Sequence, residues 1–508
     1  MLLEKLALTS EEVARTSSRL GKVELLAGTL GGMDATEVAT GVAYLSGRLP
    51  QGTVGVGWAS LRDPPPPASP PPTLRLLDVD AAVARLAKVA GSGSQGRRRR
   101  ELTELFSRAT EAEQRFLTRL LLGELRQGAL EGVMVDAVAR AASLPGSVIR
   151  RGLMLSGDLG VVAAAAIGEG AAGLERFRLT LLSPIKPMLA QTADGLPEAL
   201  ARAGPAAVEW KLDGARIQVH RLGDEVRAFT RNLADVTDRL PEVAEAVRRL
   251  PVEAVVLDGE AIALRADGRP QPFQVTMSRF GSRLDVGEHR RRVSLSPFFF
   301  DCLHVDGDDL LDLPARERFA ALADHVPTEL RAPRSEGVDE AEAERVLDEA
   351  LGRGHEGVMV KALDSPYEAG RRGAGWLKVK RAHTLDLVVL AAEWGHGRRQ
   401  GRLSNLHLGA RDPERGGFVM LGKTFKGMTD QMLAWQTEEL LRLESGRDRY
   451  IVHVRPELVV EVAFDGVQRS RRYPGGVALR FARIKGYRPD KSAAEADTIE
   501  TLRAIRDG

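Results

Sequence analysis

The chain is poor in the residues and patterns that mark secreted, zinc-binding or membrane-spanning proteins. Its 508 residues include one cysteine, Cys302, which excludes a disulfide framework and a four-cysteine zinc module. Residues 1–6 lack the apolar stretch of a signal peptide. The longest run of small apolar residues, 161–167, is far too short to cross a bilayer. We therefore expect a cytoplasmic protein with no membrane partner.

An excess of charge of one sign is also missing. The chain has 72 lysines and arginines against 70 aspartates and glutamates, a formal net charge of +2. This balance does not demand a nucleic acid partner, so local clusters of charge carry more information than the total. The length predicts two to four domains. The 43% of hydrophobic residues is ordinary for a globular protein with several cores.

Residues 1–178 are expected to form a helical domain. Apolar residues recur with helical spacing in 113–126, and Gly128 ends the pattern. Residues 63–72 are nearly all proline and are expected to form an extended spacer. A Gly/Ser-rich loop at 91–96 leads into four arginines, 97–100. This loop either offers amides and positive charge to a phosphate chain or is a solvated, flexible basic loop.

The rest of the chain changes texture twice. Residues 179–382 alternate between strand and helix patterns, which predicts an α+β domain. Within them, 252–264 is expected to be a strand pair with an acidic turn, and 297–303 a buried aromatic strand. Residues 383–508 show short strands broken by glycine and one helix near 431–444. That spacing fits a small five-stranded β-barrel of the OB type.

The stretch with the clearest chemistry is 207–221. Residues 207–210 are typical of a short strand, Asp213 and Gly214 give a hairpin-type turn signal, and 214–221 alternate like a second strand. Lys211 lies at this tight connection, beside a carboxylate and an arginine. A free lysine amine has a pKa of about 10.4 and must lose its proton before it attacks an electrophile. Cationic neighbours and desolvation lower that pKa, and the same cations neutralise phosphate. A phosphorus electrophile is therefore its natural partner, although a solvated surface turn gives the same short pattern.

Further motifs follow in a fixed order. They are residues 211–216 (Lys-Leu-Asp-Gly-Ala-Arg), 230–232 (Thr-Arg-Asn), 257–260 (Leu-Asp-Gly-Glu), 297–303 (Pro-Phe-Phe-Phe-Asp-Cys-Leu), 356–361 (Glu-Gly-Val-Met-Val-Lys) with 376–380 (Trp-Leu-Lys-Val-Lys), and the basic stretch 480–491. In this order and spacing they resemble the signature of covalent nucleotidyltransferases, specifically the ATP-dependent DNA ligases. Residues 116–132 are similar to the helical DNA-binding domain that many such ligases carry.

The resemblance implies a multidomain protein with three parts. An all-α N-terminal DNA-binding domain is expected at 1–178, an α+β nucleotidyltransferase (adenylation) domain at 179–382, and a β-barrel OB-fold domain at 383–508. The same resemblance makes Lys211 the catalytic residue, which attacks the α-phosphate of ATP and forms lysyl-AMP. It places Glu209 at the adenine amino group and Phe300 on the adenine face, where an aromatic ring stacks well. Phe300 is also compatible with a place in the core, where Phe298 and Phe299 are expected.

Charged residues in the later motifs take the other roles that the resemblance implies. Arg216 and Arg231 are expected at the sugar or phosphates, where a guanidinium makes bidentate contacts. Glu260 and Glu356 are expected to serve the ribose and a divalent metal, Mg²⁺ or Mn²⁺. Two carboxylates suffice because Mg²⁺ keeps waters and phosphate oxygens as its other ligands.

Two groups of cations complete the set. Lys378 and Lys380 are expected on one face of a strand, both pointing at the α-phosphate. Arg483, Arg488 and Lys491 are expected on the OB domain, where they orient the pyrophosphate leaving group. Because these three lie far from Lys211 in the sequence, the OB domain is expected to close for this step and to swing away later.

The family reaction has three steps, and it defines the expected partners. Lysyl-AMP forms, AMP passes to the 5′-phosphate at a nick, and the 3′-hydroxyl then seals the strand. We expect nicked duplex DNA as substrate, a monomeric enzyme associated with the nucleoid, and separate proteins for any repair or end-joining role. The single cysteine disfavours an NAD-dependent DNA ligase. The alternatives are an RNA ligase or an mRNA capping enzyme, against which the helical N-terminal domain and the motif at Trp376 favour DNA. A catalytically inactive DNA clamp is a third alternative, and nothing in the sequence supports it because Lys211 and its partners are all present.

Overall fold

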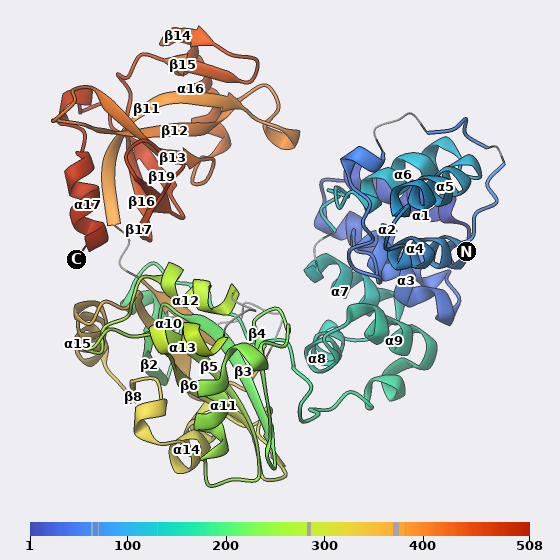
Figure 1. The fold of residues 1–508 in the computed structure, drawn as a ribbon, viewed down its shortest axis with the longest axis horizontal. Helices are drawn as coiled ribbons and strands as arrows, with labels where there is room; N and C mark the ends of the chain where they lie inside the picture. The colour runs from blue at the N-terminus through green and yellow to red at the C-terminus, as the bar shows by residue number, and fades with distance from the viewer. Residues whose placement is uncertain are drawn as a thin grey trace. The chain divides into compact units, whose positions relative to one another are not determined.

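The computed structural model describes residues 1–61, 65–69, 71–129, 131–281, 286–368, 375–380 and 383–507. Residues 63, 64 and 70 of the predicted proline-rich spacer, and residue 382 at the predicted domain boundary, lie outside this set. The chain divides into two compact units (Figure 1). The first unit comprises residues 1–355 and 359–378, and the second comprises 356–358 and 379–508. Each unit is described by itself.

The N-terminal part of the first unit is helical, as predicted. Its helices pack around one continuous apolar core, which holds Leu6, Leu26, Val42 and Phe116 among many others. The helices are α1 (Leu3–Arg15), α2 (Arg19–Gly31), α3 (Ala35–Leu45), α4 (Leu76–Lys88), α5 (Ser94–Ser107), α6 (Glu111–Leu121), α7 (Glu131–Ala141), α8 (Gly146–Ser156) and α9 (Leu159–Leu174), with a 3₁₀ turn η1 (Trp58–Ser60).

Helix α6 carries the predicted amphipathic stripe. Its start is fixed by a capping box, in which the Glu113 carboxylate accepts a hydrogen bond from the Thr110 amide at 2.8 Å. Phe116 and Leu117 are buried on its inner face. The predicted helix over 113–126 is too long, because α6 ends at Leu121 and Gly123 follows with φ +68°. A left-handed glycine just after the last turn is a common way to stop a helix.

The four arginines at 97–100 are helical rather than part of a loop. Helix α5 starts at Ser94, directly after Gly93 with φ +73°. The guanidinium groups of Arg97 and Arg98 donate hydrogen bonds back to the carbonyl oxygens of Ala90 and Val89. The alternative of a flexible basic loop is wrong for the arginines, and the predicted Gly/Ser loop is shorter than expected because α5 begins at Ser94. The basic side chains instead begin a helix and hold the preceding turn against it. Binding of a phosphate chain here stays a prediction.

The remainder of the first unit is built on two five-stranded sheets of the described residues, ordered β1-β10-β9-β2-β8 and β4-β3-β5-β6-β7. The strands are β1 (Gln191–Thr192), β2 (Ala206–Lys211), β3 (Ala215–Leu222), β4 (Glu225–Thr230), β5 (Ala254–Ala263), β6 (Leu295–Val305), β7 (Asp308–Asp309), β8 (Arg334–Glu336), β9 (Gly357–Ala362) and β10 (Trp376–Val379). The helices are α10 (Leu196–Ala203), α11 (Pro241–Arg248), α12 (Phe273–Gly281), α13 (Val286–Arg292), α14 (Ala315–His325) and α15 (Glu340–Gly352), with 3₁₀ turns η2 (Thr237–Arg239) and η3 (Thr328–Leu330).

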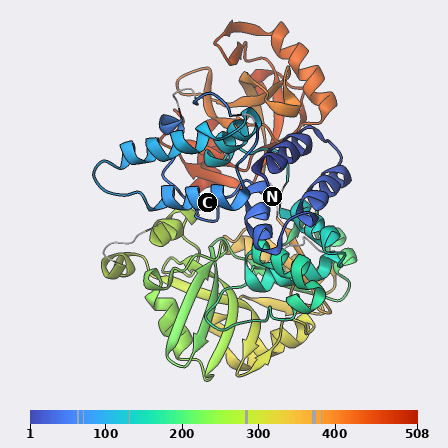
Figure 2. The same cartoon turned by 90° about the vertical axis from the view of Figure 1, so that its right-hand side faces the viewer.

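The second of these sheets packs one face on an apolar core and carries the polar side chains of β3 on the other. Its strands β3 to β6 are the long green arrows of Figure 2. Ile217 and Val219 of β3 join a buried core with Val243 of α11 and Leu322 of α14. Because side chains alternate along a strand, the other face carries the polar residues. The register of β3 with β5 places Arg216 opposite Glu260 on that face.

Strand β5 contradicts the predicted strand pair at 252–264. It runs without a turn from Ala254 to Ala263 and pairs along its length with β3 and β6. Gly259, which suggested an acidic turn, lies inside the strand. A Cβ there would come within 2.7 Å of the Phe299 ring and 2.8 Å of the Phe298 carbonyl oxygen. The glycine therefore permits a close approach of β6 rather than a reversal of the chain.

The second unit is rich in strands. Its elements are β11 (His383–Trp394), η4 (Gly397–Arg399), β12 (Leu403–Arg411), β13 (Phe418–Thr424), α16 (Asp430–Arg442), β14 (Glu444–Arg447), β15 (Ile451–Val454), β16 (Val459–Phe464), β17 (Gly466–Arg469), β18 (Val477–Arg480), β19 (Arg483–Tyr487), η5 (Ala493–Glu495) and α17 (Ile499–Asp507). The predicted OB-type region is confirmed as a β-rich domain. Its described strands form a seven-stranded sheet and a separate β17–β18 hairpin, more than the five strands expected.

The long strand β11 organises this unit. Its first half, His383 to Val388, pairs with β16, and its second half pairs with β15. Its other edge pairs with β12. Strand β11 therefore connects β16 on one half of the sheet with β15 on the other. The sheet surrounds a core that includes Leu387 and Phe464. In neither unit do the described residues form a helix long and apolar enough to cross a membrane.

Candidate active site

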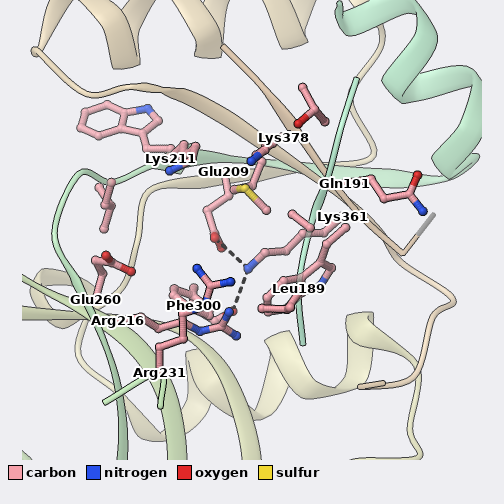
Figure 3. A pocket seen from close by; sticks show the side chains of 16 residues that line it. Leu189, Gln191, Glu209, Lys211, Arg216, Arg231, Glu260, Phe300, Lys361 and Lys378 are labelled. Atoms are coloured by element: carbon pink, nitrogen blue, oxygen red, sulfur yellow. Dashed lines mark hydrogen bonds and ion pairs between the residues drawn. The ribbon is translucent and has the colours of Figure 1, made fainter. Parts of the chain in front are cut away.

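A cavity of about 670 Å³ in the first unit is lined by side chains from both of its sheets (Figure 3). The lining residues are Leu189, Ala190, Gln191, Thr192, Glu209, Trp210, Lys211, Leu212, Arg216, Arg231, Glu260, Phe300, Met359, Lys361, Trp376 and Lys378. The predicted site residues that the structure brings together here are Glu209, Lys211, Arg216, Arg231, Glu260, Phe300 and Lys378.

Lys211 is the last residue of β2, and the predicted tight connection follows it. The connection is not a hairpin, because β2 and β3 belong to different sheets. Lys211 therefore lies where the chain crosses from one wall of the cavity to the other. Gly214 lets this crossing pack against β5, since a Cβ there would lie 2.6 Å from the Ala261 carbonyl oxygen. Leu212 is buried beside the crossing.

Glu209 lies two residues before Lys211 and is held by two cations. Its Oε1 is 2.7 Å from the Nζ of Lys361, and its Oε2 accepts a hydrogen bond from the Nε of Arg334 at 2.9 Å. A second nitrogen of Arg334 also donates to Oε2. Arg334 is in place because β8 pairs with β2 so that the two residues lie opposite each other. Burial lowers the pKa of Lys361 to about 8, a shift that the Glu209 charge opposes and the Arg334 charge reinforces.

Aromatic rings surround the Lys361 ammonium. Its Nζ lies 4.4 Å from the ring centre of Phe300 and 4.5 Å from that of Trp376, within the range of cation–π attraction. The two rings meet edge to face at 5.8 Å. Phe299 points to the core as predicted, whereas Phe298 is only half-buried and packs beside Leu212 and Ile262. Phe300 is half-buried and faces the cavity.

Arg216 lines the cavity with its guanidinium held by a buried carboxylate. Its Nε and Nη2 donate to Asp258 at 3.0 Å and 2.6 Å, and its Nη1 donates to the Met188 carbonyl oxygen at 2.6 Å. The Tyr367 hydroxyl donates to the same carboxylate at 2.6 Å. Although burial opposes it, the Asp258 charge raises the pKa of Arg216. Burial likewise raises the pKa of Tyr367 well above its usual value. This network fixes Arg216 in its charged form at the cavity wall.

Three more charged residues complete the lining. Arg231 follows β4 and is exposed, while Glu260 on β5 and Lys378 on β10 are half-buried. Arg231, Lys378, Lys211 and Arg216 thus bring cations to the cavity wall from four different strands or their ends, in addition to Lys361 of β9. Such a set can neutralise phosphates in a partly enclosed space, where charge–charge interactions are stronger than in water.

The remaining predicted site residues belong to the second unit. The expectation that Lys380 shares a strand face with Lys378 is wrong, because β10 ends at Val379. The Lys380 ammonium instead pairs with Glu356 at 2.5 Å and with Asp465 at 3.3 Å. Arg483 pairs with the same Asp465 at 3.3 Å. Acidic partners within this unit therefore hold these cations.

The last two cations of the basic stretch share one carboxylate. Arg488 lies 3.2 Å from Asp386 and Lys491 lies 2.5 Å from it. Arg488 also pairs with Asp490 at 2.6 Å, which raises the pKa of the guanidinium. Arg483, Arg488 and Lys491 thus sit on one domain, each with an acidic partner.

The carboxylates of the first-unit cavity fit a metal that arrives with phosphates rather than a permanent metal cage. No group of three or more His, Cys, Asp and Glu side chains that could hold a metal ion is found in the described part of the chain. Glu260 lines the cavity beside the phosphate-compatible cations. Mg²⁺ commonly takes one or two carboxylates together with waters and substrate phosphates. The donor chemistry therefore suits Mg²⁺ or Mn²⁺ bound with a nucleotide.

Sequence reasoning missed several of the residues that build this site. Lys361 and Trp376 lie inside recognised motifs but were given no role. The alternation Val-Met-Val-Lys in β9, with Met359 and Lys361 on one face, is the signal that could have identified Lys361. Arg334 and Tyr367 lie outside all of the motifs, 125 and 109 residues from their carboxylate partners. No local pattern could have found them.

Family comparisons agree over most of the chain. A model described as "DNA ligase N terminus" matches residues 58–139. One described as "ATP dependent DNA ligase domain" matches 187–380, and one described as "ATP dependent DNA ligase C terminal region" matches 399–491.

Full-length relatives give the same picture. A "Probable DNA ligase" of Anaeromyxobacter sp. (strain Fw109-5) is 61% identical over 508 residues, which cover 99% of this chain and 98% of the relative. "DNA ligase B" of Mycobacterium tuberculosis (strain CDC 1551 / Oshkosh) is 58% identical over 509 residues, 99% of this chain and 100% of the relative. The solved structure named "Pmar-Lig_PreS3" has the same fold, with a TM-score of 0.62 at 20% identity over 95% of this chain and 99% of its own.

Fold and site together define a nucleotidyltransferase core flanked by a helical region and an OB region. With relatives about 60% identical over their whole length, the chain belongs to the ATP-dependent DNA ligase family. The enzyme is a DNA ligase that uses ATP, which confirms the prediction made from the motifs.

Proposed function

We propose that the cavity of the first unit is the adenylation site and that Lys211 is its nucleophile. The observation that carries this proposal is the meeting of Glu209, Lys211, Phe300 and Lys378 in one cavity, although they come from three strands far apart in the sequence. The Lys211 amine attacks the α-phosphate of ATP, a phosphoramidate bond forms, and pyrophosphate leaves. The amine must be neutral when it attacks, so its proton must leave before the new bond forms.

The base and sugar are placed by other residues that line the cavity. Glu209 accepts a hydrogen bond from the adenine amino group, and the Phe300 ring stacks on the base. Arg216 and Arg231 contact the ribose and phosphates. Lys378 neutralises charge that develops on the α-phosphate as it is attacked. Electrostatic stabilisation of this kind dominates phosphoryl-transfer catalysis.

A divalent metal, Mg²⁺ or Mn²⁺, would supply further charge neutralisation at the phosphates when bound. Glu260 is the cavity residue that would hold it, with Glu356 of the second unit as the other candidate. On the second unit, Lys380 serves the α-phosphate, and Arg483, Arg488 and Lys491 orient the pyrophosphate. These cations then exchange their acidic partners for phosphate oxygens.

The later steps act on DNA. AMP passes from Lys211 to the 5′-phosphate at a nick in duplex DNA, and the 3′-hydroxyl then attacks that phosphate and releases AMP. The helical domain (1–178) binds the duplex, the adenylation domain (179–382) does the chemistry, and the OB domain (383–508) closes and opens. We propose that the enzyme works as a monomer in the cytoplasm, at the nucleoid, with any repair or end-joining partners as separate proteins.

The test is a covalent-labelling experiment with a chase. The pure protein is incubated with Mg²⁺ and α-labelled ATP, or with adenylate-labelled NAD, and resolved on a denaturing gel. Nicked duplex DNA or nicked RNA is then added. Label retained from ATP only, and lost as the DNA nick is sealed, is the expected result. Label that RNA discharges and DNA does not would identify an RNA ligase instead, and the absence of covalent label would overturn the assignment of Lys211.

A further inference from the structure

Lys361 is a buried cation for which the proposed reaction has no use. Its side chain is 1% exposed, and the Glu209 side chain that it contacts is 2% exposed. The arrangement is visible in Figure 3, where Lys361 reaches from β9 to the carboxylate of Glu209. Burying a charged amine is unfavourable unless it is paired and hydrogen-bonded. Because the buried charge of Lys361 is costly, we expect Lys361 to have a role in the nucleotide cavity, which it lines.

The contacts of Glu209 leave a limited and defined hydrogen-bonding capacity. An ionised carboxylate has about four lone-pair sites and no proton to donate. Two hydrogen bonds from Arg334 go to Oε2, and Lys361 occupies one site on Oε1. One acceptor site is left on Oε1. With a cation on each oxygen, the carboxylate can neither rotate nor take up a proton without breaking a buried ion pair.

The Lys361 ammonium is itself held in place on every side. It lies 3.4 Å from the Phe300 carbonyl oxygen and over the rings of Phe300 and Trp376. The centre of the Phe319 ring lies 5.6 Å from the Lys361 Nζ. Lys361 thus contacts both Glu209, which is proposed to bind the adenine amino group, and Phe300, which is proposed to stack on the adenine ring.

We propose that Lys361 is a positioning residue for base selection: acting through Glu209, it fixes a carboxylate that can only accept hydrogen bonds, so that the site takes a 6-aminopurine and rejects a 6-oxopurine. This inference rests on the proposed placement of adenine at Glu209 and Phe300. The adenine N6 amino group is a donor, whereas the guanine O6 is an acceptor. A fixed acceptor pairs with the first and repels the second. Sites whose buried polar groups would be left unpaired by the wrong substrate reject it strongly.

The titration of Lys361 gives this proposal a second signature. The charged groups facing the ammonium are Glu209 on β2, Arg334 on β8 and Asp301 on β6. Burial is the largest influence and lowers the pKa of Lys361 to about 8. The ammonium is therefore mostly charged at pH 7 and loses its proton as the pH rises through 8. Selection of ATP over GTP should weaken over the same pH range, and an arginine at 361, which stays charged, should prevent the change.

The test compares the kcat/KM of covalent nucleotide transfer to the enzyme for ATP and GTP. The ratio of the two is the readout, because the fraction of folded enzyme cancels from it. Lys361→Met is expected to lower the ATP:GTP ratio by about 10- to 100-fold, chiefly through KM, as befits the loss of one charge-assisted hydrogen bond. Lys361→Arg is expected to keep most of the selectivity.

A matched control separates base selection from a loss of packing. Arg318 forms an equally buried pair with Asp301, at 2.8 Å, next to Phe300 on β6, but is absent from the cavity lining. Arg318→Lys should leave the ratio unchanged. An unchanged ratio in Lys361→Met would overturn the inference while leaving the adenylation site intact. If wild-type enzyme formed no covalent nucleotide at all, the proposed function would fail instead.

A pH series keeps the proposal falsifiable should Lys361→Met not fold. Wild-type enzyme is assayed with both nucleotides from pH 7 to 9.5, beside Lys361→Arg. A ratio that falls between about pH 7 and 9 in wild type, centred near pH 8, and stays level in Lys361→Arg is the expected result. A level ratio in wild type, or an equal fall in both proteins, would overturn it.

Discussion

The charges of the nucleotide cavity and those of the basic stretch in the second unit are held in opposite ways. In the cavity wall, Glu209, Lys361 and Asp258 are almost fully buried, each against a fixed partner. In the second unit, Arg488 and Lys491 share one carboxylate, and their side chains are 30% and 32% exposed. The first region is assembled before a substrate arrives, whereas the second keeps its cations in contact with water.

The difference follows from what each kind of ion pair contributes. A buried pair is costly to break, because the partner left behind is an uncompensated charge. A solvated pair contributes little, because water replaces the lost partner. Cations such as Lys491 can therefore exchange a carboxylate for a phosphate with little loss. That property suits a domain proposed to close on ATP and then to leave, while the cavity that positions the nucleotide stays rigid.

Removing the nucleophile should have the largest effect of all. Lys211→Ala is expected to abolish covalent adenylation and to leave folding and binding of nicked DNA intact, since Lys211 is half-buried and lines the cavity rather than the core. Labelling with α-labelled ATP, circular dichroism and a gel-shift assay measure the three properties. Lys423→Ala, which removes a half-exposed lysine paired with Glu393 in the second unit, is the control. A Lys211→Ala protein that still bound AMP covalently would show that another residue is the nucleophile.

The next effect distinguishes a cavity cation from an OB cation. Lys378→Met is expected to slow adenylation by about 10²-fold, the usual cost of losing one preorganised group that stabilises developing charge. Because Lys378 stays in the cavity, it should also slow the sealing of a nick that already carries AMP. Lys491→Met should slow adenylation only, since pyrophosphate takes part in no later step.

Single-turnover assays with ATP and with pre-adenylated nicked DNA separate these cases. Equal effects of Lys378→Met and Lys491→Met on the sealing step would break the comparison between the two regions, because the proposed division of labour would then be absent.

Local sequence spacing located the site better than it located the walls around it. Lys211 was found from the turn signal at Asp213 and Gly214 and from the alternation of 214–221, and Glu209 from the resemblance to the ligase motifs. That alternation identifies a strand but not its partner, and so β2 and β3 were taken for a hairpin although they lie in different sheets. Likewise Gly259 gave a turn signal, where in fact its missing Cβ permits the contact with Phe299.

The residues that hold Glu209 and Asp258 in place could not be predicted because they lie far away in the sequence. Arg334 meets Glu209 across 125 residues, through the pairing of β8 with β2. Tyr367 reaches Asp258 across 109 residues. Such contacts depend on the topology of the sheets, which no pattern within a short window encodes. Chemistry carried by motifs can be predicted from one sequence, whereas the groups that hold those motifs in place require the fold.

The free energy of unfolding should depend strongly on the buried ion pairs of the cavity and only weakly on the exposed ion pairs of the second unit. Asp258→Ala leaves Arg216 buried without its bidentate partner and leaves the Tyr367 hydroxyl without an acceptor. The expected loss is about 3–5 kcal/mol of unfolding free energy for the first unit. Asp490→Ala removes only a solvent-exposed partner of Arg488 and should not shift the urea midpoint measurably. Similar midpoints for the two variants would show that the cavity network is not the rigid element described above.

The smallest effect is a pH dependence of the unfolding free energy that arises from one buried histidine of the first unit, His220. His220 is fully buried on β3, with its Nε2 2.9 Å from the Gln218 amide oxygen, and burial lowers the pKa of its imidazole to about 3. In the unfolded chain the same group titrates near 6.5. Stability from the neutral imidazole is therefore complete above pH 6.5. It declines as the pH falls towards 3, by roughly 1.4 kcal/mol per pH unit, because only the unfolded chain binds the proton.

His220→Gln removes this titration, so its unfolding free energy should change less between pH 6.5 and 4.5 than that of the wild type. His453 is the control: it lies exposed on β15 with its Nε2 2.9 Å from Asp448, and His453→Gln should keep the wild-type slope. Urea unfolding at three pH values measures all three proteins. A wild-type slope in His220→Gln would mean that burial does not keep the His220 imidazole neutral in the folded protein.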